Sequence, residues 1–327
     1  MDSAKKYLND WFKVIENMKN ENTYKLAWGR AIIECIIQDS FYVNYDNNQL
    51  IIDFDEISKC MIKYYWNQSF FFNLKQSSNK EPEIYKQTKR LIEEYKKLSN
   101  STIPVWYDKG MQVIQQSNIQ LYKDVIKKVS STLHLDVSWR FKNIQNETID
   151  LYTYRKELGS KVIFDFSEAM ILKEYGAIIS QLLNYKWAQL LEKFNYAPKI
   201  VNKVNGIAIS KLERESLKKY KIELIKQFDD GNIVDFYTGE LLTADEATVD
   251  HVIPWSFMYS NDIWNLVLTS RSNNSSKSNT IPSEEVIKKL KERNRKLLNI
   301  LDGKYREDLL ISIENGYVDK FYFDCRL

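Results

Sequence analysis

The alternation of hydrophobic and polar positions predicts a mainly helical chain with small β elements. Residues 4–39 carry apolar residues at helical spacing, with a polar break near residues 20–22, which indicates two helices. Two short apolar runs within residues 41–54 flank the polar turn at residues 46–48 and predict a hairpin. The aromatic-rich segment 56–72 is typical of a buried core, because aromatic side chains dominate buried area. A base-stacking role for these rings is the less favoured alternative.

Further helices are predicted at residues 83–98 and 111–130. Two strand-like runs are predicted within residues 149–166, around Gly159. A long helix follows, with Ser167 as its predicted N-cap and Glu168 in its first turn. The fold class we expect is therefore α+β and mainly helical, with a helical N-terminal region that contains a small hairpin.

We predict three regions along the chain. Residues 1–148 form a helical N-terminal region for docking a partner or DNA, residues 149–231 a helical connector, and residues 232–327 the C-terminal domain. The turn-forming residues 229–232 mark the boundary before the last region. No linker marks the first boundary sharply.

Composition narrows the class of protein. Hydrophobic residues make up 44% of the 327 residues and charged residues 28%, so a sizeable core is expected and global disorder is excluded. The net charge of +3 is too small to indicate nucleic-acid binding, so any basic surface must be local. Three widely spaced cysteines indicate a reducing compartment without a disulfide framework. Without an apolar N-terminal segment or a membrane-length run, we expect a cytoplasmic protein that makes no membrane contact.

The residues that carry chemistry lie between positions 236 and 282. We predict a hairpin around Thr238-Gly239, a short strand that begins with residues 248–250 and is ended by Pro254, a second strand at residues 265–269 and a short helix at residues 272–278. The order is therefore strand, loop, strand, helix. Histidine is the side chain whose usual pKa suits a general base near neutral pH. The Asp250 carboxylate and the Asn274 amide oxygen are ligands for a hard cation. Adjacent strand residues point to opposite faces, so a twist or bulge is needed to aim Asp250 and His251 at one phosphate.

This pattern resembles the HNH (ββα-metal) endonuclease superfamily. The segments Asp-His-Val-Ile-Pro-x-Ser-Phe, Asn-x-Val-Leu-Thr and Asn-x-x-Lys-Ser carry the resemblance, and Asn265 and Asn274 follow Asp250 by 15 and 24 positions. The spacing is similar to that of the HNH domain of RNA-guided CRISPR nucleases. The wider segment also resembles HNH nucleases of bacterial restriction and phage-defence systems.

The resemblance implies a role for each matching residue. His251 would be the general base, Asp250 and Asn274 the metal ligands, Asn265 the residue that fixes the loop, and Lys277 a phosphate contact. The implied metal is Mg²⁺, for which Mn²⁺ can substitute.

One departure from the family concerns its structural zinc. Many relatives carry cysteine pairs that bind zinc around this module, whereas Asp235, Thr238 and Asn273 stand at some of the expected positions here. Three scattered cysteines cannot build a four-cysteine site, so no structural zinc is expected. We expect apolar packing to hold the module together instead.

Two stretches around the motif are locally basic. Residues 199–226 and 271–296 each carry eight Lys or Arg residues against three Glu residues, which fits contacts with a phosphate backbone or, equally, solvated helix faces. Arg271 and Arg293 are the backbone contacts that we predict, together with Lys277. His134, in an apolar context, is predicted to be a structural histidine.

The favoured function is a metal-dependent endonuclease that hydrolyses DNA, in bacterial antiphage defence or restriction. A second hypothesis is an effector subunit of a defence complex, silent until a sensor, an ATPase or a guide-containing partner releases it. A third is a catalytically dead DNA-binding module, against which the intact His251, Asp250 and Asn274 argue.

Overall fold

The computed structural model describes residues 2–77, 81–145, 147–154, 159–195, 197, 199–205, 215–228, 231–277 and 279–326. The chain divides into two compact units, which are described separately. Unit 1 comprises Met1–Asn195 and Ile200–Ser210, and unit 2 comprises Tyr196–Lys199 and Lys211–Leu327. None of the helices in the described ranges has the length and apolar character needed to cross a membrane.

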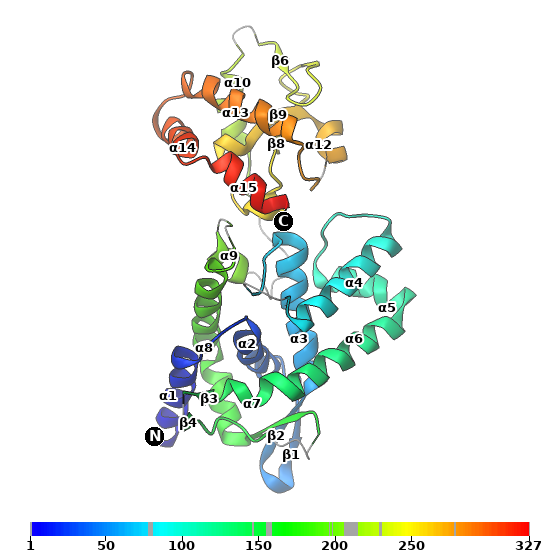
Figure 1. Ribbon diagram of the computed structural model, residues 1–327, viewed down its shortest axis with the longest axis vertical. Coiled ribbons are helices and arrows are strands. Elements are labelled where there is room, and N and C mark those ends of the chain that lie inside the picture. Colours follow the sequence, from blue (N-terminus) through cyan, green and yellow to red (C-terminus); the bar gives the residue numbers. More distant parts are fainter. Residues whose placement is uncertain are drawn as a thin grey trace. The chain divides into compact units, whose positions relative to one another are not determined.

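Unit 1 is organised around the buried helix α2 (Tyr24–Ile37), which lies between α8 (Phe166–Glu192) and α3 (Phe54–Trp66) (Figure 1). Gly176 of α8 permits close approach to α2, because a Cβ there would lie 2.9 Å from an Ile37 side-chain carbon. The other helical segments are α1 (Asp2–Asn17), η1 (Tyr45–Asn47), η2 (Asn67–Phe71), α4 (Glu83–Ser99), α5 (Tyr107–Ser117), α6 (Ile119–Thr132), η3 (Leu133–Val137), α7 (Ser138–Phe141) and α9 (Ile200–Asn205).

The predicted hairpin is the start of a three-stranded antiparallel sheet. Strand β2 (Gln49–Asp53) pairs with β1 (Tyr42–Asn44) on one side and with β5 (Lys161–Asp165) on the other. Because β5 completes this sheet and α8 packs on α2, residues 149–195 belong to the same compact unit as the N-terminal region. The two-unit division therefore differs from the three regions predicted from the sequence. Strands β3 (Asn143–Ile144) and β4 (Glu147–Thr148) form a second, minimal hairpin.

Three local predictions in unit 1 need correction. The helix predicted at residues 111–130 is two helices, α5 and α6, which meet at Asn118; the Asn118 side chain accepts a hydrogen bond from Leu121 N and caps α6. The N-cap of α8 is Asp165 rather than Ser167, since its carboxylate accepts the Ser167 N–H at 2.8 Å. Of the two strands predicted within residues 149–166, β5 forms, while Thr153 contributes an isolated bridge to Ile163.

The aromatic segment lies in the core of unit 1, as predicted. The side chains of Tyr64, Tyr65 and Trp66 are fully buried. Two of the cysteines also meet here, because α2 and α3 bring Cys35 Sγ to 3.9 Å from Cys60 Sγ. All three cysteines are free thiols.

Unit 2 contains the predicted order of strand, loop, strand and helix. Strands β8 (Ala247–His251) and β9 (Leu266–Ser270) pair antiparallel, and α12 (Arg271–Lys277) follows β9 directly and packs on both. Its other elements are α10 (Lys218–Ile225), β6 (Ile233–Val234), β7 (Leu241–Leu242), α11 (Trp255–Met258), η6 (Ile263–Asn265), α13 (Glu284–Leu298), α14 (Gly303–Glu314) and α15 (Tyr317–Arg326). One apolar core joins the strands to α13, α14 and α15, so the mainly helical α+β class holds for both units.

Candidate active site

The candidate site lies where β8 ends and α12 packs against it. The pairing of β8 with β9 is regular through Asp250, opposite Val267, and His251, opposite Leu266. No β-bulge therefore redirects the two side chains. His251 is instead the last residue of the strand, and the chain bends immediately after it at residues 252–253.

Asp250 is 7% exposed and is held by two side chains from other elements. Its Oδ2 accepts a hydrogen bond from the Tyr237 hydroxyl at 2.6 Å and lies 3.0 Å from Lys277 Nζ. Burial, and then the nearby Asp250 carboxylate, raise the pKa of the Tyr237 phenol far above its ordinary value, so the phenol remains a donor.

Lys277 points into the site rather than towards solvent. Its Nζ also donates to the His251 carbonyl at 2.6 Å and lies 5.7 Å from the centre of the Tyr237 ring. With its side chain 13% exposed, Lys277 is the counter-ion of Asp250 in this structure, whereas the sequence predicted that it faces a phosphate.

The imidazole of His251 is oriented by a residue that follows it by ten positions. His251 Nε2 lies 2.9 Å from Asn261 Oδ1, an oxygen that can only accept a hydrogen bond. The proton of this bond therefore sits on Nε2, so in the neutral form of the ring the lone pair lies on Nδ1. Such a tautomer presents Nδ1 as the basic nitrogen.

Asn265 holds the loop that follows His251. Its amide is completely buried and forms two hydrogen bonds of 2.8 Å with the main chain of Ile253, one to the N–H and one to the carbonyl. The Val252 N–H donates to the Asn265 carbonyl at 2.9 Å. These three bonds fix the bend after β8, and with it the position of His251.

Asn274 lies on α12, half-buried beside β8. Its Nδ2 is 3.5 Å from the Val249 carbonyl, at the limit of a hydrogen bond. Within the described ranges, no donor binds its Oδ1, so this amide oxygen is available as a ligand.

The buried Asp235 carboxylate forms hydrogen bonds with several of the elements around the site. Asp235 is fully buried, and its two oxygens accept five hydrogen bonds. The donors are Tyr237 N (2.8 Å), Thr238 N (3.2 Å), Thr269 Oγ1 (2.9 Å), Ser270 N (2.8 Å) and Asn273 Nδ2 (2.8 Å). Burial alone would raise the pKa of Asp235, but the bonds from Ser270, Asn273, Thr238 and Thr269 lower it to about 2.

This arrangement adds a buried carboxylate to the apolar core that the sequence led us to expect in the module. Asp235, Thr238 and Asn273, which stand where relatives carry zinc-binding cysteines, meet at one point in space. The Asp235 carboxylate joins the turn after β6, the end of β9 and the start of α12, which are the elements such a zinc would join.

The two arginines predicted to contact DNA lie in different environments. Arg271, the first residue of α12, is exposed. Arg293, in α13, is only 8% exposed and donates to the Trp264 carbonyl at 3.4 Å. A side chain beneath the surface cannot contact a phosphate backbone, so the interpretation of Arg293 as a DNA contact is wrong. It is buried because α13 places it on the same face as Leu290 and Leu297.

Three contacts of the site were not predicted from the sequence: the bond from Tyr237 to Asp250, the bond between His251 and Asn261, and the five bonds to the Asp235 carboxylate. Tyr237 sits at the predicted Thr238-Gly239 turn, which could have drawn attention to it. No local pattern singles out Asn261, since its role depends on how the loop after α11 folds back to His251.

The comparisons with known proteins separate the two units. The family model of a domain of unknown function (DUF8808) matches residues 5–205, more than half of the chain. The chain belongs to the DUF8808 family. In this family member, a second model, described as HNH endonuclease, matches residues 235–283. That segment contains Asp235, Tyr237, Asp250, His251 and Asn274.

Curated relatives match the HNH region. The CRISPR-associated endonuclease Cas9 of Streptococcus mutans serotype c is 41% identical over 86 residues, which cover 25% of this chain and 6% of that protein. Cas9 of Listeria innocua serovar 6a is 37% identical over 86 residues, with the same coverage. The predicted resemblance to the Cas9 HNH domain is thus confirmed, although this DUF8808 chain matches only a small part of those relatives' length. No solved structure matches the chain.

Proposed function

We propose that this protein is a metal-dependent endonuclease that hydrolyses phosphodiester bonds in DNA. The observation that carries the proposal is that Asp250 and an oriented His251 end β8, with Asn274 on the helix packed against that strand, inside the segment that matches the HNH endonuclease model. The HNH match lies wholly in unit 2, so this proposal assigns no role to unit 1.

His251 is the general base in this proposal. With the Nε2 proton donated to Asn261, Nδ1 takes a proton from the water that attacks the phosphorus. Asn265 and Asn261 act as positioning residues: Asn265 fixes the bend that carries His251, and Asn261 fixes the tautomer.

The donor set at the site fits a hard divalent cation. Asp250 Oδ1 and Asn274 Oδ1 receive no hydrogen bond from the described part of the chain, and carboxylate and amide oxygens are the ligands that Mg²⁺ and Mn²⁺ prefer. When bound, such a cation supplies charge stabilisation at the phosphate and at the leaving 3′ oxygen.

Lys277 neutralises Asp250 when no cation is bound. An ammonium and a divalent cation on one carboxylate repel each other, so Lys277 is expected to move away from Asp250 on metal binding. Its displaced ammonium could then contact the phosphate, which is the role predicted from the sequence. Arg271, exposed on α12, remains a proposed backbone contact.

Cleavage of plasmid, single-stranded DNA and RNA, with Mg²⁺, Mn²⁺ or EDTA, tests the proposal. His251→Ala is expected to slow cleavage by about 10²- to 10⁴-fold, the contribution of a positioned base. Asp250→Asn is expected to weaken Mn²⁺ binding measured directly by calorimetry. The matched control is Asp245→Asn, since Asp245 is exposed in the same unit. Wild-type cleavage by His251→Ala protein with an unchanged thermal melt would refute the assignment of the base.

The second candidate is an effector subunit of a cytoplasmic antiphage defence or restriction complex. The observation that favours it is the separate unit 1, a compact domain of a family without a known function, suited to docking a sensor, an ATPase or a guide-containing partner. The Cas9 relatives are themselves CRISPR-associated endonucleases. Purified protein that cleaves DNA only after a partner from its own operon is added would favour this candidate.

A further inference from the structure

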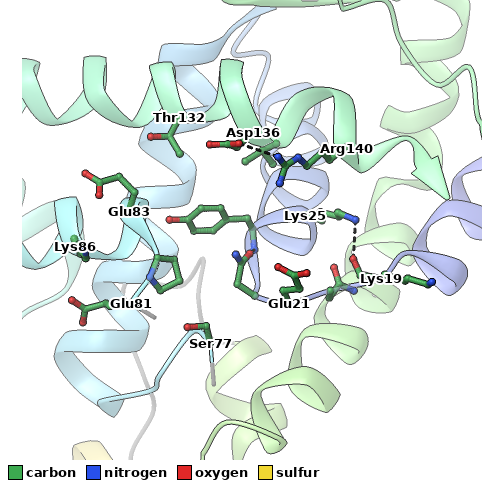
Figure 2. A pocket seen from close by; sticks show the side chains of 15 residues that line it. Lys19, Glu21, Lys25, Ser77, Glu81, Glu83, Lys86, Thr132, Asp136 and Arg140 are labelled. Atoms are coloured by element: carbon green, nitrogen blue, oxygen red, sulfur yellow. Dashed lines mark hydrogen bonds and ion pairs between the residues drawn. The ribbon is translucent and has the colours of Figure 1, made fainter. Parts of the chain in front are cut away.

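Two clefts of more than 600 Å³ lie among the described residues of unit 1, and the HNH module explains neither. The larger, of about 770 Å³, lies between the α1–α2 loop, the start of α4 and the end of α6 (Figure 2). Its charged lining residues are Lys19, Lys25, Lys86 and Arg140 against Glu21, Glu81, Glu83 and Asp136. Arg140 pairs with Asp136 at 3.2 Å and Lys25 donates to the Lys19 carbonyl at 2.8 Å. With its charges balanced in this way, the larger cleft indicates no class of ligand.

The second cleft has an excess of positive charge. It has a volume of about 630 Å³, within the usual range for small-molecule sites, and lies between α3 and α6. Its charged lining residues are Lys59, Lys123, Lys127 and Asp55. The other polar residues that line it are Tyr122, Ser130, Ser131, His134 and Ser160. Three ammonium groups thus face a single carboxylate, and three serine hydroxyls lie among them.

Two of these lysines carry charge that the protein does not neutralise. Lys123 and Lys127 stand one turn apart on the same face of α6. Both are exposed, and neither forms an ion pair with any residue in the described ranges. Lys59 differs, because Glu56 lies 2.6 Å from its Nζ.

His134 lines this cleft and is held in place by Tyr154. The Tyr154 hydroxyl donates to the His134 carbonyl at 2.7 Å and lies 3.0 Å from Nδ1. The ring also packs against Phe54, with centroids 6.3 Å apart. Nε2 has no hydrogen-bond partner in the described part of the chain. His134 lies in the π-helical turn η3, a geometry that is frequent at functional sites.

We propose that the cleft lined by Lys59, Lys123, Lys127 and His134 binds a phosphate group, carried either by a free nucleotide or by a nucleic-acid strand. Ammonium and hydroxyl donors match the charge and the acceptor oxygens of phosphate. The inference does not depend on the nuclease proposal, since the cleft lies wholly in unit 1.

Binding is measured by fluorescence anisotropy on full-length protein in EDTA, with labelled oligothymidylates of increasing length and a labelled ATP analogue. Inorganic phosphate serves as the competitor. Lys127→Gln should weaken binding about fivefold, the value expected for one charge in contact across water. Lys128→Gln is the matched control: Lys128 is exposed on the same helix, lies outside the cleft and carries the same charge. Lys123→Gln should weaken binding by a similar factor, while the thermal melts of both variants confirm folding.

The outcomes distinguish the two sources of phosphate. Saturable binding of the ATP analogue that Lys127→Gln weakens would identify a free nucleotide. Binding of oligothymidylates alone, weakened by the same variant, would identify a nucleic-acid strand. Equal losses in Lys127→Gln and Lys128→Gln, or no binding of any probe, would overturn the proposal. None of these outcomes bears on DNA cleavage, which is measured separately with the His251→Ala variant.

Discussion

Replacing Asp235 by Asn is the sharpest test of how the HNH module is held together. The variant keeps the size of the side chain but turns one acceptor oxygen into an NH₂ group. Whichever way the amide is oriented, that NH₂ faces at least two donors, either Ser270 N–H and Asn273 Nδ2 or the N–H groups of Tyr237 and Thr238. Each buried donor left without an acceptor costs about 1–3 kcal/mol.

The pKa of Asp235 reflects the same hydrogen bonds and gives a second magnitude. Its fall from 3.8 to about 2 means that the ionised carboxylate contributes about 2 kcal/mol to folding. Because the pKa is lower in the folded state, this stability is fully present above pH 3.8 and is lost as the pH falls through about 2. Two donors left without an acceptor cost about 2–6 kcal/mol together, so Asp235→Asn should destabilise unit 2 by roughly that amount at pH 7, a large part of a domain's stability.

Hydrogen exchange read by mass spectrometry is the suitable assay, because it reports on β8 and β9 separately from unit 1. Peptides that cover these strands should lose protection in Asp235→Asn at pH 7, whereas α2 should be unchanged. The control, Asp245→Asn, replaces an exposed carboxylate and should stay within about 0.5 kcal/mol of the parent. Asn273→Ala removes one of the five bonds and should fall between the two. Equal protection in Asp235→Asn and Asp245→Asn would show that the carboxylate does not hold the module.

Three further predictions concern stability and surface charge. Burial, followed by the nearby acidic residues, raises the pKa of Glu168 from 4.5 to about 7, so the free energy of unfolding falls as the pH rises from 4.5 to 7. Glu168→Gln should therefore raise the melting temperature at pH 8 but hardly at pH 5. Equal shifts at both pH values would contradict this. Arg293→Met should preserve or raise the melting temperature without changing DNA affinity, since Nε and Nη1 are buried without partners among the described residues; weaker DNA binding would restore Arg293 as a contact. Gly110→Ala should destabilise unit 1 by about 1–3 kcal/mol because the new Cβ would lie 2.3 Å from the Trp66 ring, and an unchanged melting temperature would refute that estimate.

The sequence by itself determined the elements and the chemical identity of the HNH segment. Helical spacing predicted α1, α2 and α4, and the order β8, loop, β9, α12 followed from residues close together in the chain. Asp250, His251 and Asn274 were recognisable because the motif fixes their residue types at set spacings. Such signals survive in a sequence because they depend on neighbours within one or two turns or along one strand.

Only the tertiary structure decided which distant residues meet. Tyr237 and Lys277 reach Asp250 from a turn and a helix, Asn261 folds back to His251, and β5 joins β2 across more than a hundred residues. Arg293 illustrates the limit of reading charge from sequence, because the rotation of α13 against the core sets whether a basic residue faces solvent. Asp235 illustrates the same limit for a polar hub. Its acid is one of many in the chain, and only the packing of β6, β9 and α12 around it brings five donors within reach of one carboxylate.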